Sequence, residues 1–163
     1  MPPEAINDNV FRLIGNDWML ITAGDIRSFN MMTANWGGFG ILWGKKICFC
    51  VIRPQRYTYK FMGNSSSFTL SFFGKEYKDV LNFCGTTSGR DVDKVKETGL
   101  TPVAGSSGTV YFKEARLILI CRKIYFQDIN QLNFIDPKIH EHYPEKDYHR
   151  MYIGEVIECL LKD

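Results

Sequence analysis

The segment CGTTSGRDVDK, residues 84–94, joins two short stretches whose apolar residues recur at helical spacing. The first stretch runs from Tyr77 to Cys84, and the second begins at Val92 and ends at Gly99. The segment therefore predicts a loop between two helices, rich in glycine and hydroxyl groups and carrying the cations Arg90 and Lys94. Backbone N–H groups at a helix start, hydroxyls and cations together suit an anion the size of phosphate.

A purely structural interpretation of this loop stays open. Ser88 and Asp91 have the spacing of a capping-box variant, and Gly89 has the conformational freedom that a tight turn requires. Lys94 has alternative partners in Asp91 and Asp93, and with either it would contact no ligand. The phosphate interpretation needs support from the rest of the chain.

Length and composition indicate one globular domain over residues 1–163. The net charge is only +2 and the basic residues are dispersed, which gives no argument for a nucleic-acid surface. No apolar run is long enough to cross a bilayer, and the N-terminus does not resemble a secretory signal. Five cysteines at scattered spacings predict reduced thiols, and we expect a cytoplasmic protein.

The apolar patterns predict a mainly β protein with short helices, an antiparallel barrel and no βαβ sheet. Residues 67–73 alternate cleanly and predict a strand with one buried face. Residues 1–9 are expected to form a loose arm, and residues 127–150, which hold all three histidines, a mobile excursion or lid. The further expected strands are residues 18–24, 46–52, 115–126 and 152–160.

Two further polar segments interrupt the apolar pattern. In residues 30–38, amide and hydroxyl side chains lie among bulky apolar residues, and Gly37 and Gly38 permit close approach of a backbone or a ligand. A heteroaromatic ring would satisfy these polar groups, and a bulged strand whose polar groups bond one another is the alternative. Residues 53–58 follow a strand directly, where loops commonly carry binding groups; solvated surface charge is the alternative there.

Established catalytic and metal-binding patterns are missing from the sequence. It contains no Gly-x-Ser-x-Gly elbow, no dinucleotide-binding glycine motif and no P-loop. His140 and His142 have no third ligand at a convincing spacing, and the Cys48-x-Cys50 pair is better explained as core thiols. We therefore predict no metal and no catalytic side chain. The three polar segments together predict a site for a phosphorylated heteroaromatic cofactor.

The same three segments carry a family resemblance. The order NMMTANW at residues 30–36, RPQRYTY at 53–59 and CGTTSGRDVDK at 84–94 resembles the flavin reductase-like, FMN-binding family that includes flavoredoxin. The resemblance runs from about Trp18 to Leu119. It implies an FMN-binding split β-barrel, antiparallel and homodimeric, with the flavin near the subunit interface.

The resemblance also implies which residues bind the cofactor. Those that line the isoalloxazine are Asn30, Met31, Met32, Thr33, Ala34, Asn35 and Trp36. Those that hold the ribityl phosphate are Arg53, Gln55, Arg56, Thr58, Ser88, Gly89, Arg90 and Lys94. Family members often have serine where Gln55 stands, so Gln55 departs from the pattern.

Chemistry at flavin N5 would then need no catalytic side chain. Our first hypothesis is a reductase that passes a hydride from NAD(P)H to FMN and electrons on to an acceptor. The second is an electron-transfer flavoprotein that serves a redox partner protein and has no NAD(P)H site. The third is a ligand-binding barrel without a redox role.

Overall fold

The computed structural model describes residues 1–162 and contains one large antiparallel sheet. Its seven strands lie in the order β2-β1-β5-β8-β9-β4-β3, and a separate two-stranded sheet pairs β6 with β7. The strands are β1 (Met19–Asp25), β2 (Ser28–Ala34), β3 (Gly37–Leu42), β4 (Lys45–Ile52), β5 (Ser67–Phe72), β6 (Pro102–Ala104), β7 (Val110–Phe112), β8 (Leu117–Asp128) and β9 (Arg150–Leu161). The expected mainly β, antiparallel fold class is confirmed.

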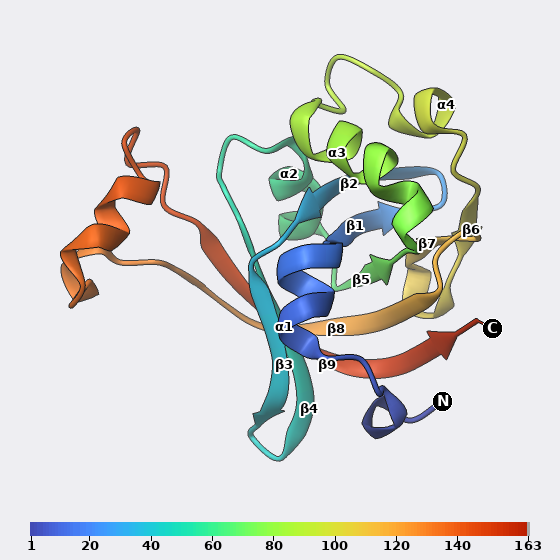
Figure 1. Ribbon diagram of the computed structural model, residues 1–163, viewed down its shortest axis with the longest axis horizontal. Helices are drawn as coiled ribbons and strands as arrows, with labels where there is room; N and C mark the ends of the chain where they lie inside the picture. Colours follow the sequence, from blue (N-terminus) through green and yellow to red (C-terminus); the bar gives the residue numbers. More distant parts are fainter. Residues whose placement is uncertain (163) are drawn as a thin grey trace.

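Short helices cover the sheet (Figure 1). They are α1 (Val10–Arg12), which continues as the π-helix Leu13–Asp17, α2 (Tyr57–Asn64), α3 (Lys78–Thr86) and α4 (Lys94–Thr98). Short 3₁₀ segments occupy Pro3–Ala5, Lys75–Tyr77, Ser106–Gly108, Gln131–Asn133 and Pro137–His142. Within residues 1–162, no helix is both long enough and apolar enough to cross a bilayer.

The two edge strands of the sheet, β2 and β3, are consecutive in the chain. They lie at opposite ends of the strand order, yet only Asn35 and Trp36 separate Ala34 from Gly37. The sheet must therefore curl until its two edges meet at this link. The result is a barrel with an open seam between β2 and β3, the split form that the resemblance implies.

Strand β5 differs from its prediction because both of its faces are buried. Phe68, Leu70 and Phe72 point into the main barrel core, as the alternation indicated. The polar face is also covered, because β7 packs on it and the Thr69 hydroxyl donates to the Val110 carbonyl at 2.6 Å. The prediction of one exposed face was wrong, because the alternation within residues 67–73 does not indicate that β7 covers the polar face.

The barrel interior contains the paired thiols of β4. Cys48 and Cys50 share one buried face, as predicted, and all five cysteines are buried and not disulfide-bonded. The Cys48 sulfur lies 3.3 Å from the Cys121 sulfur of β8, across β9. Gly154 of β9 makes this approach possible, because a Cβ there would come within 2.9 Å of the Cys121 Cβ. These thiols are core packing groups.

The helix–loop–helix region follows the prediction with one shift. Helix α3 buries Leu81 and Cys84, and Gly99 ends α4 in the left-handed conformation with φ of 71°. Helix α4 begins at Lys94 and not at Val92, because the Asp93 side chain caps it by accepting from the Lys96 N–H. Ser88 forms a tight turn, with its hydroxyl accepting from the Arg90 N–H, so the capping-box interpretation is wrong.

The N-terminal arm is more ordered than predicted. The ammonium group of Met1 donates to the Cys159 carbonyl at 2.7 Å, and Asp8 forms an ion pair with Arg116 at 2.7 Å. The expectation of a loose arm over residues 1–9 was wrong, because polar groups distant in the sequence hold it against the end of β9 and the start of β8.

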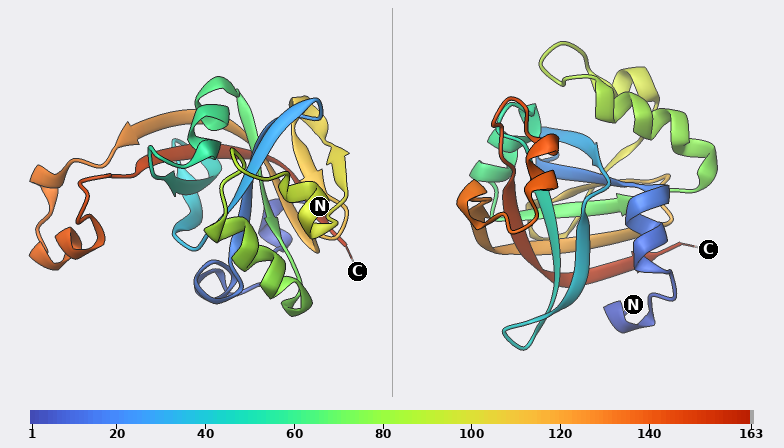
Figure 2. Two further views of the ribbon diagram at one scale, coloured as in Figure 1. Left: turned by 90° about the horizontal axis from the view of Figure 1, so that it is seen from above. Right: turned by 60° about the vertical axis from the view of Figure 1, so that its left-hand side comes forward.

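Residues 129–149, here called the excursion, connect the paired ends of β8 and β9. The pairing of Asp128 with Arg150 closes the base of the excursion, and their side chains form an ion pair at 2.7 Å. The excursion projects from the barrel body in Figure 1 and in the left-hand view of Figure 2. The excursion is shorter than the predicted segment 127–150, because Gln127 and Asp128 belong to β8 and Arg150 belongs to β9; its predicted mobility and its role as a lid stay predictions.

Candidate functional site

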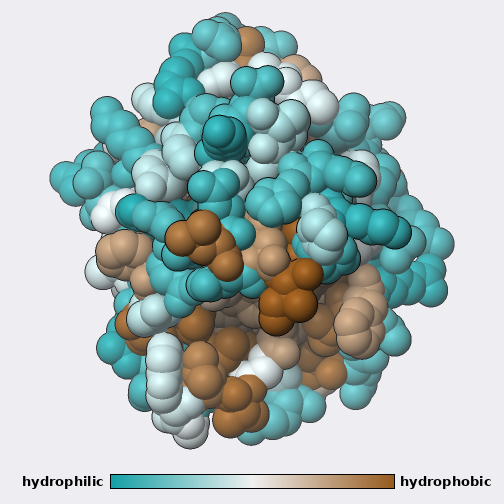
Figure 3. Space-filling view, turned by 90° about the vertical axis from the view of Figure 1, so that its left-hand side faces the viewer, coloured by the Kyte–Doolittle hydropathy of each residue, from teal (hydrophilic) through white to brown (hydrophobic). Residues whose placement is uncertain are grey.

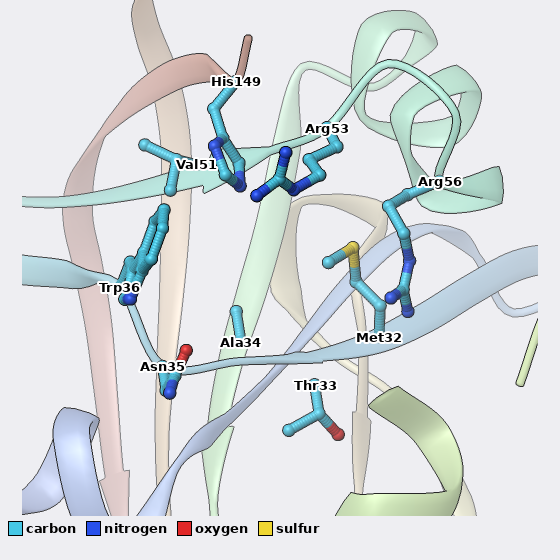
Figure 4. Close-up of a pocket in the computed structure, with 9 residues that line it drawn as sticks. All are labelled: Met32, Thr33, Ala34, Asn35, Trp36, Val51, Arg53, Arg56 and His149. Carbon is cyan, nitrogen blue, oxygen red and sulfur yellow. The ribbon is translucent and has the colours of Figure 1, made fainter. Parts of the chain in front are cut away.

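A pocket of about 190 Å³ lies where the barrel seam meets the excursion (Figure 4). It is lined by the end of β2, the link to β3, the end of β4, the residue before α2 and the residue before β9. The lining residues are Met32, Thr33, Ala34, Asn35, Trp36, Val51, Arg53, Arg56 and His149. Seven of these nine belong to the predicted site.

Strand β2 presents alternate side chains to the pocket. Met32 and Ala34 lie on the pocket side of the ribbon, and Thr33 lies on the other side (Figure 4). The Thr33 hydroxyl donates to the Leu81 carbonyl and so fixes β2 against α3. Because β2 is an edge strand, one side of its backbone has no partner strand within residues 1–162.

A second hollow, of about 680 Å³, lies beside the loop that precedes α4. The predicted residues that line it are Asn30, Met31, Gly89, Arg90 and Lys94. The other three predicted residues, Gln55, Thr58 and Ser88, line neither hollow in the described part of the chain. The structure thus divides the predicted site between two hollows and the contacts between them.

The three polar segments come together in space. Asn30 of the first segment donates through its side-chain amide to the Thr58 hydroxyl of the second at 2.8 Å. Gly89 of the third lies so close to Asn30 that a Cβ would come within 2.1 Å of its amide oxygen. Lys94 donates to the Met31 carbonyl at 2.8 Å. The polar side chains of residues 30–35 therefore bond to other segments and not to one another, and β2 pairs with β1 in a continuous register, so the bulged-strand alternative is wrong.

Three cations of this site are bonded to carbonyl groups and have no carboxylate partner within residues 1–162. Arg56 donates to the Gly85 carbonyl at 2.8 Å, at the C-terminal end of α3. Arg90 donates to the Gln55 carbonyl at 3.0 Å and lies over the Tyr57 ring. Lys94 is the third. Carbonyls satisfy the hydrogen bonds of these cations but leave their positive charge uncompensated, which favours an anionic ligand.

Lys94 has a buried ammonium group, with 4% of the residue exposed. Its Nζ donates to the carbonyls of Met31 and Cys84, at 2.8 and 2.9 Å, and not to Asp91 or Asp93. Burial lowers its pKa from 10.5 to about 8, with the neighbouring Arg56 charge acting in the same direction. The alternative ion pair with the loop aspartates is therefore wrong, and a bound anion would stabilise the charged form of Lys94.

Arg53 and Gln55 have a different environment, because both bond to Asp147 of the excursion. The Arg53 guanidinium lies 2.7 Å from the Asp147 carboxylate, and the Gln55 amide donates to the same oxygen at 2.5 Å. Arg53 also donates to the His142 carbonyl at 2.8 Å. Their predicted role in phosphate binding stays a prediction.

Trp36 and His149 form an aromatic wall of the pocket. Their ring centroids are 5.1 Å apart, and His142 contacts the same indole at 5.1 Å. The His149 Nδ1 lies 2.7 Å from the Tyr143 hydroxyl. Burial lowers the His149 pKa from 6.5 to about 4, so the imidazole is neutral near pH 7.

Val51 and His149 are the pocket residues that the predicted site lacks. Val51 belongs to a continuous apolar strand and offers no distinguishing signal. His149 is a histidine directly before the last strand, in the segment expected to form an excursion or lid, and that placement was a usable signal.

Gly37 and Gly38 do permit close approach, but to protein and not to a ligand. A Cβ at Gly37 would lie 2.6 Å from the Phe49 carbonyl, and one at Gly38 would lie 2.5 Å from the Phe49 ring. These glycines let β3 pair tightly with β4 and so fix the far side of the seam.

The fold and site together define a split antiparallel barrel with a seam pocket and a group of uncompensated cations. A family model described as "Flavin reductase like domain" matches residues 11–163, so the chain belongs to the flavin reductase-like family, as the sequence resemblance indicated. No match was found among curated protein sequences.

Solved structures of similar fold include several flavin proteins. Flavoredoxin of Desulfovibrio vulgaris (Miyazaki F) is 23% identical, with a TM-score of 0.70 over 90% of this chain and 69% of that chain. An FMN-binding protein from Thermus thermophilus is 19% identical, with a TM-score of 0.69 over 89% and 71%. An NADH:FAD oxidoreductase of Streptomyces globisporus is 16% identical, with a TM-score of 0.67 over 90% and 75%.

Proposed function

We propose that this protein binds FMN along the barrel seam and acts as an NAD(P)H-dependent flavin reductase. The observation that carries the proposal is the group of cations Arg56, Arg90 and Lys94, which form no ion pair with a carboxylate within residues 1–162. A ribityl phosphate supplies the missing negative charge. Membership of the flavin reductase-like family supports the same conclusion.

The pocket chemistry also fits a flavin ring. The ring has hydrogen-bonding groups along one edge, and β2 offers unpartnered backbone groups as the edge of the sheet. Trp36 and His149 supply an aromatic wall, and Asn35 supplies an exposed amide beside it. A planar, partly apolar ring therefore has matching surfaces in this pocket.

FMN, when bound, supplies the redox chemistry by accepting a hydride at N5 and releasing electrons to an acceptor. The chain binds and orients the cofactor. Met32, Ala34 and Val51 exclude water from one side of the pocket, and the neutral His149 offers a hydrogen-bonding group without added charge. None of these roles requires a catalytic side chain.

A flavoredoxin-type electron carrier is the second candidate, favoured by the similarity in fold to the flavoredoxin of Desulfovibrio vulgaris. In that role a redox partner protein replaces NAD(P)H as the electron donor.

We also propose that the protein forms a homodimer. Large apolar side chains lie exposed at the tip of the β3–β4 hairpin and on β8, including Ile41, Trp43 and Phe126, and apolar groups are visible on the face that carries the excursion (Figure 3).

An anaerobic visible spectrum, recorded before and after addition of NADH and then NADPH, tests the proposal. Flavin absorbance that bleaches with either nicotinamide supports the reductase and names its donor. Absorbance that persists until dithionite is added supports the electron carrier. The absence of flavin absorbance after incubation with FMN rejects both redox functions and leaves the three polar segments as structural turns.

A further inference from the structure

The excursion is fastened to the barrel body by a second group of contacts, in addition to the Asp128–Arg150 pair at its base. Asp147 receives the Arg53 guanidinium at 2.7 Å and the Gln55 amide at 2.5 Å, both on the same carboxylate oxygen. Arg53 also donates to the His142 carbonyl at 2.8 Å, and its guanidinium lies over the Tyr143 ring at 5.0 Å. Arg53 therefore contacts three residues of the excursion.

We propose that Arg53, Gln55 and Asp147 form a latch that seats the excursion over the pocket and controls access of the second substrate. This inference rests on the proposed function, in which the second substrate is the nicotinamide donor or the electron acceptor. The three side chains are positioning residues. They act through Trp36 and His149, which line the pocket.

The charge balance separates Arg53 from the phosphate-binding cations. Its guanidinium is paired with a carboxylate, whereas Arg56, Arg90 and Lys94 bond to carbonyls. An incoming phosphate gains most from cations that are not already neutralised. Phosphate therefore binds on the Arg56 side, and Arg53 stays with Asp147.

The contacts of the excursion connect the latch to the pocket wall. His149 is held by the Tyr143 hydroxyl at 2.7 Å, and both His142 and His149 contact the Trp36 ring. Figure 4 shows the Arg53 guanidinium directed toward His149 at the mouth of the pocket. Release of Asp147 frees this wall and widens the entrance.

One oxygen of the Asp147 carboxylate lacks a hydrogen-bond partner within residues 1–162, which lowers the stability of the closed latch. The second carboxylate oxygen of Asp147 is buried, and no donor among the described residues reaches it. A buried acceptor without a partner offsets part of what the ion pair contributes, and it regains water when the excursion lifts. The closed and open positions are therefore closer in free energy than a fully satisfied ion pair would leave them.

The test compares Asp147→Asn and Arg53→Gln with the matched control Glu145→Gln, which removes an exposed charge from the same excursion. Limited trypsin digestion measures latch opening through cleavage after Lys138, which lies within the excursion and is not adjacent to any substituted residue. We expect cleavage there to accelerate about tenfold in both latch variants and to stay unchanged in the control. Thermal midpoints confirm that each variant is folded.

Binding and kinetics then locate the effect. We expect the FMN dissociation constant of Asp147→Asn to stay within about twofold of wild type, while KM for the second substrate changes at least about fivefold. A double exchange, Arg53→Asp with Asp147→Arg, restores slow cleavage after Lys138 if the ion pair is the latch; only this bond is scored, because Asp147→Arg adds a trypsin site of its own. Unchanged cleavage in Asp147→Asn overturns the proposal.

A phosphate-binding role for Arg53 predicts a different effect of Asp147→Asn on FMN affinity. If Arg53 binds phosphate and Asp147 competes for it, Asp147→Asn tightens FMN binding and leaves riboflavin binding unchanged, which overturns the latch proposal. Wild-type protein that binds no FMN rejects the proposed function alone, because trypsin cleavage still reports on the latch without any cofactor.

Discussion

Replacing Lys94 with methionine tests whether the buried ammonium group contributes to FMN binding and not to the stability of the fold. The ammonium is buried and donates to the Met31 and Cys84 carbonyls. Lowering its pKa from 10.5 to about 8 means that keeping it charged at neutral pH costs about 3 kcal/mol of folding free energy. Methionine removes that cost with little change in volume.

The substitution also removes hydrogen bonds. The Cys84 carbonyl keeps a contact with the Arg56 guanidinium at 3.4 Å, whereas the Met31 carbonyl loses its side-chain donor, at a cost of about 1–3 kcal/mol. The two effects nearly cancel. At pH 7 we expect Lys94→Met to be more stable than wild type by about 0–2 kcal/mol.

The difference in stability between wild type and Lys94→Met changes with pH. The folded-state pKa lies below the unfolded-state value, so between pH 8 and 10.5 the unfolded chain binds more protons than the folded chain. The stability of the wild type therefore rises with pH through this window, and that of the variant lacks this contribution. By the upper end of the window the variant becomes the less stable protein, by about 1–3 kcal/mol.

Urea unfolding near pH 7 and near pH 10 measures this reversal, with Lys96→Met, an exposed lysine of the same helix, as the control. FMN affinity of Lys94→Met should fall about tenfold or more at pH 7, with riboflavin affinity unchanged. A loss above about 3 kcal/mol that is the same at both pH values would falsify the reasoning, because the charge would then stabilise the fold directly.

Three further substitutions test other parts of the site. Arg90→Ala should weaken FMN by about 10- to 100-fold and riboflavin by less than about twofold, since a charged hydrogen bond to phosphate is lost; equal weakening in a fluorescence titration would show that Arg90 does not bind phosphate. Gly89→Ala should lower the free energy of unfolding by about 1–3 kcal/mol, because its Cβ would lie 2.1 Å from the Asn30 amide oxygen, and a wild-type thermal midpoint would contradict that packing. His149→Phe should remove an acid-dependent loss of stability: the pKa of about 4 lies below the unfolded value of 6.5, so wild-type stability falls as pH decreases through that range, by up to about 3 kcal/mol, and an unaltered acid profile in the variant would exclude His149 as the source.

Local sequence pattern was sufficient for much of the fold. Apolar runs and alternation located β1, β4, β5, β8 and β9, and helical spacing located α3. Strand β3 escaped prediction because Gly37, Gly38 and Gly40 interrupt its pattern. Its strand conformation depends on packing against Phe49, a contact that appears only once β3 and β4 are paired.

The site was predictable where polar residues interrupt apolar sequence, and less so where pairing is distant. Asn30, Arg56 and Lys94 each stand out locally, and the structure brings their segments together. The bond between Gln55 and Asp147 spans 92 positions, and no local pattern indicates it. Arg53 looks the same in sequence whether its partner is a phosphate or a carboxylate.

The two-residue link across the seam limits how far β2 and β3 can separate at one of their ends. Three peptide units join Ala34 to Gly37, so these ends of β2 and β3 cannot separate by more than about 11 Å. The opposite ends, Ser28 and Leu42, have no such tether between them. Breathing of the barrel is therefore greatest far from Asn35 and smallest at the apex where the pocket lies, so the binding geometry is insulated from the motion of the sheet that forms it.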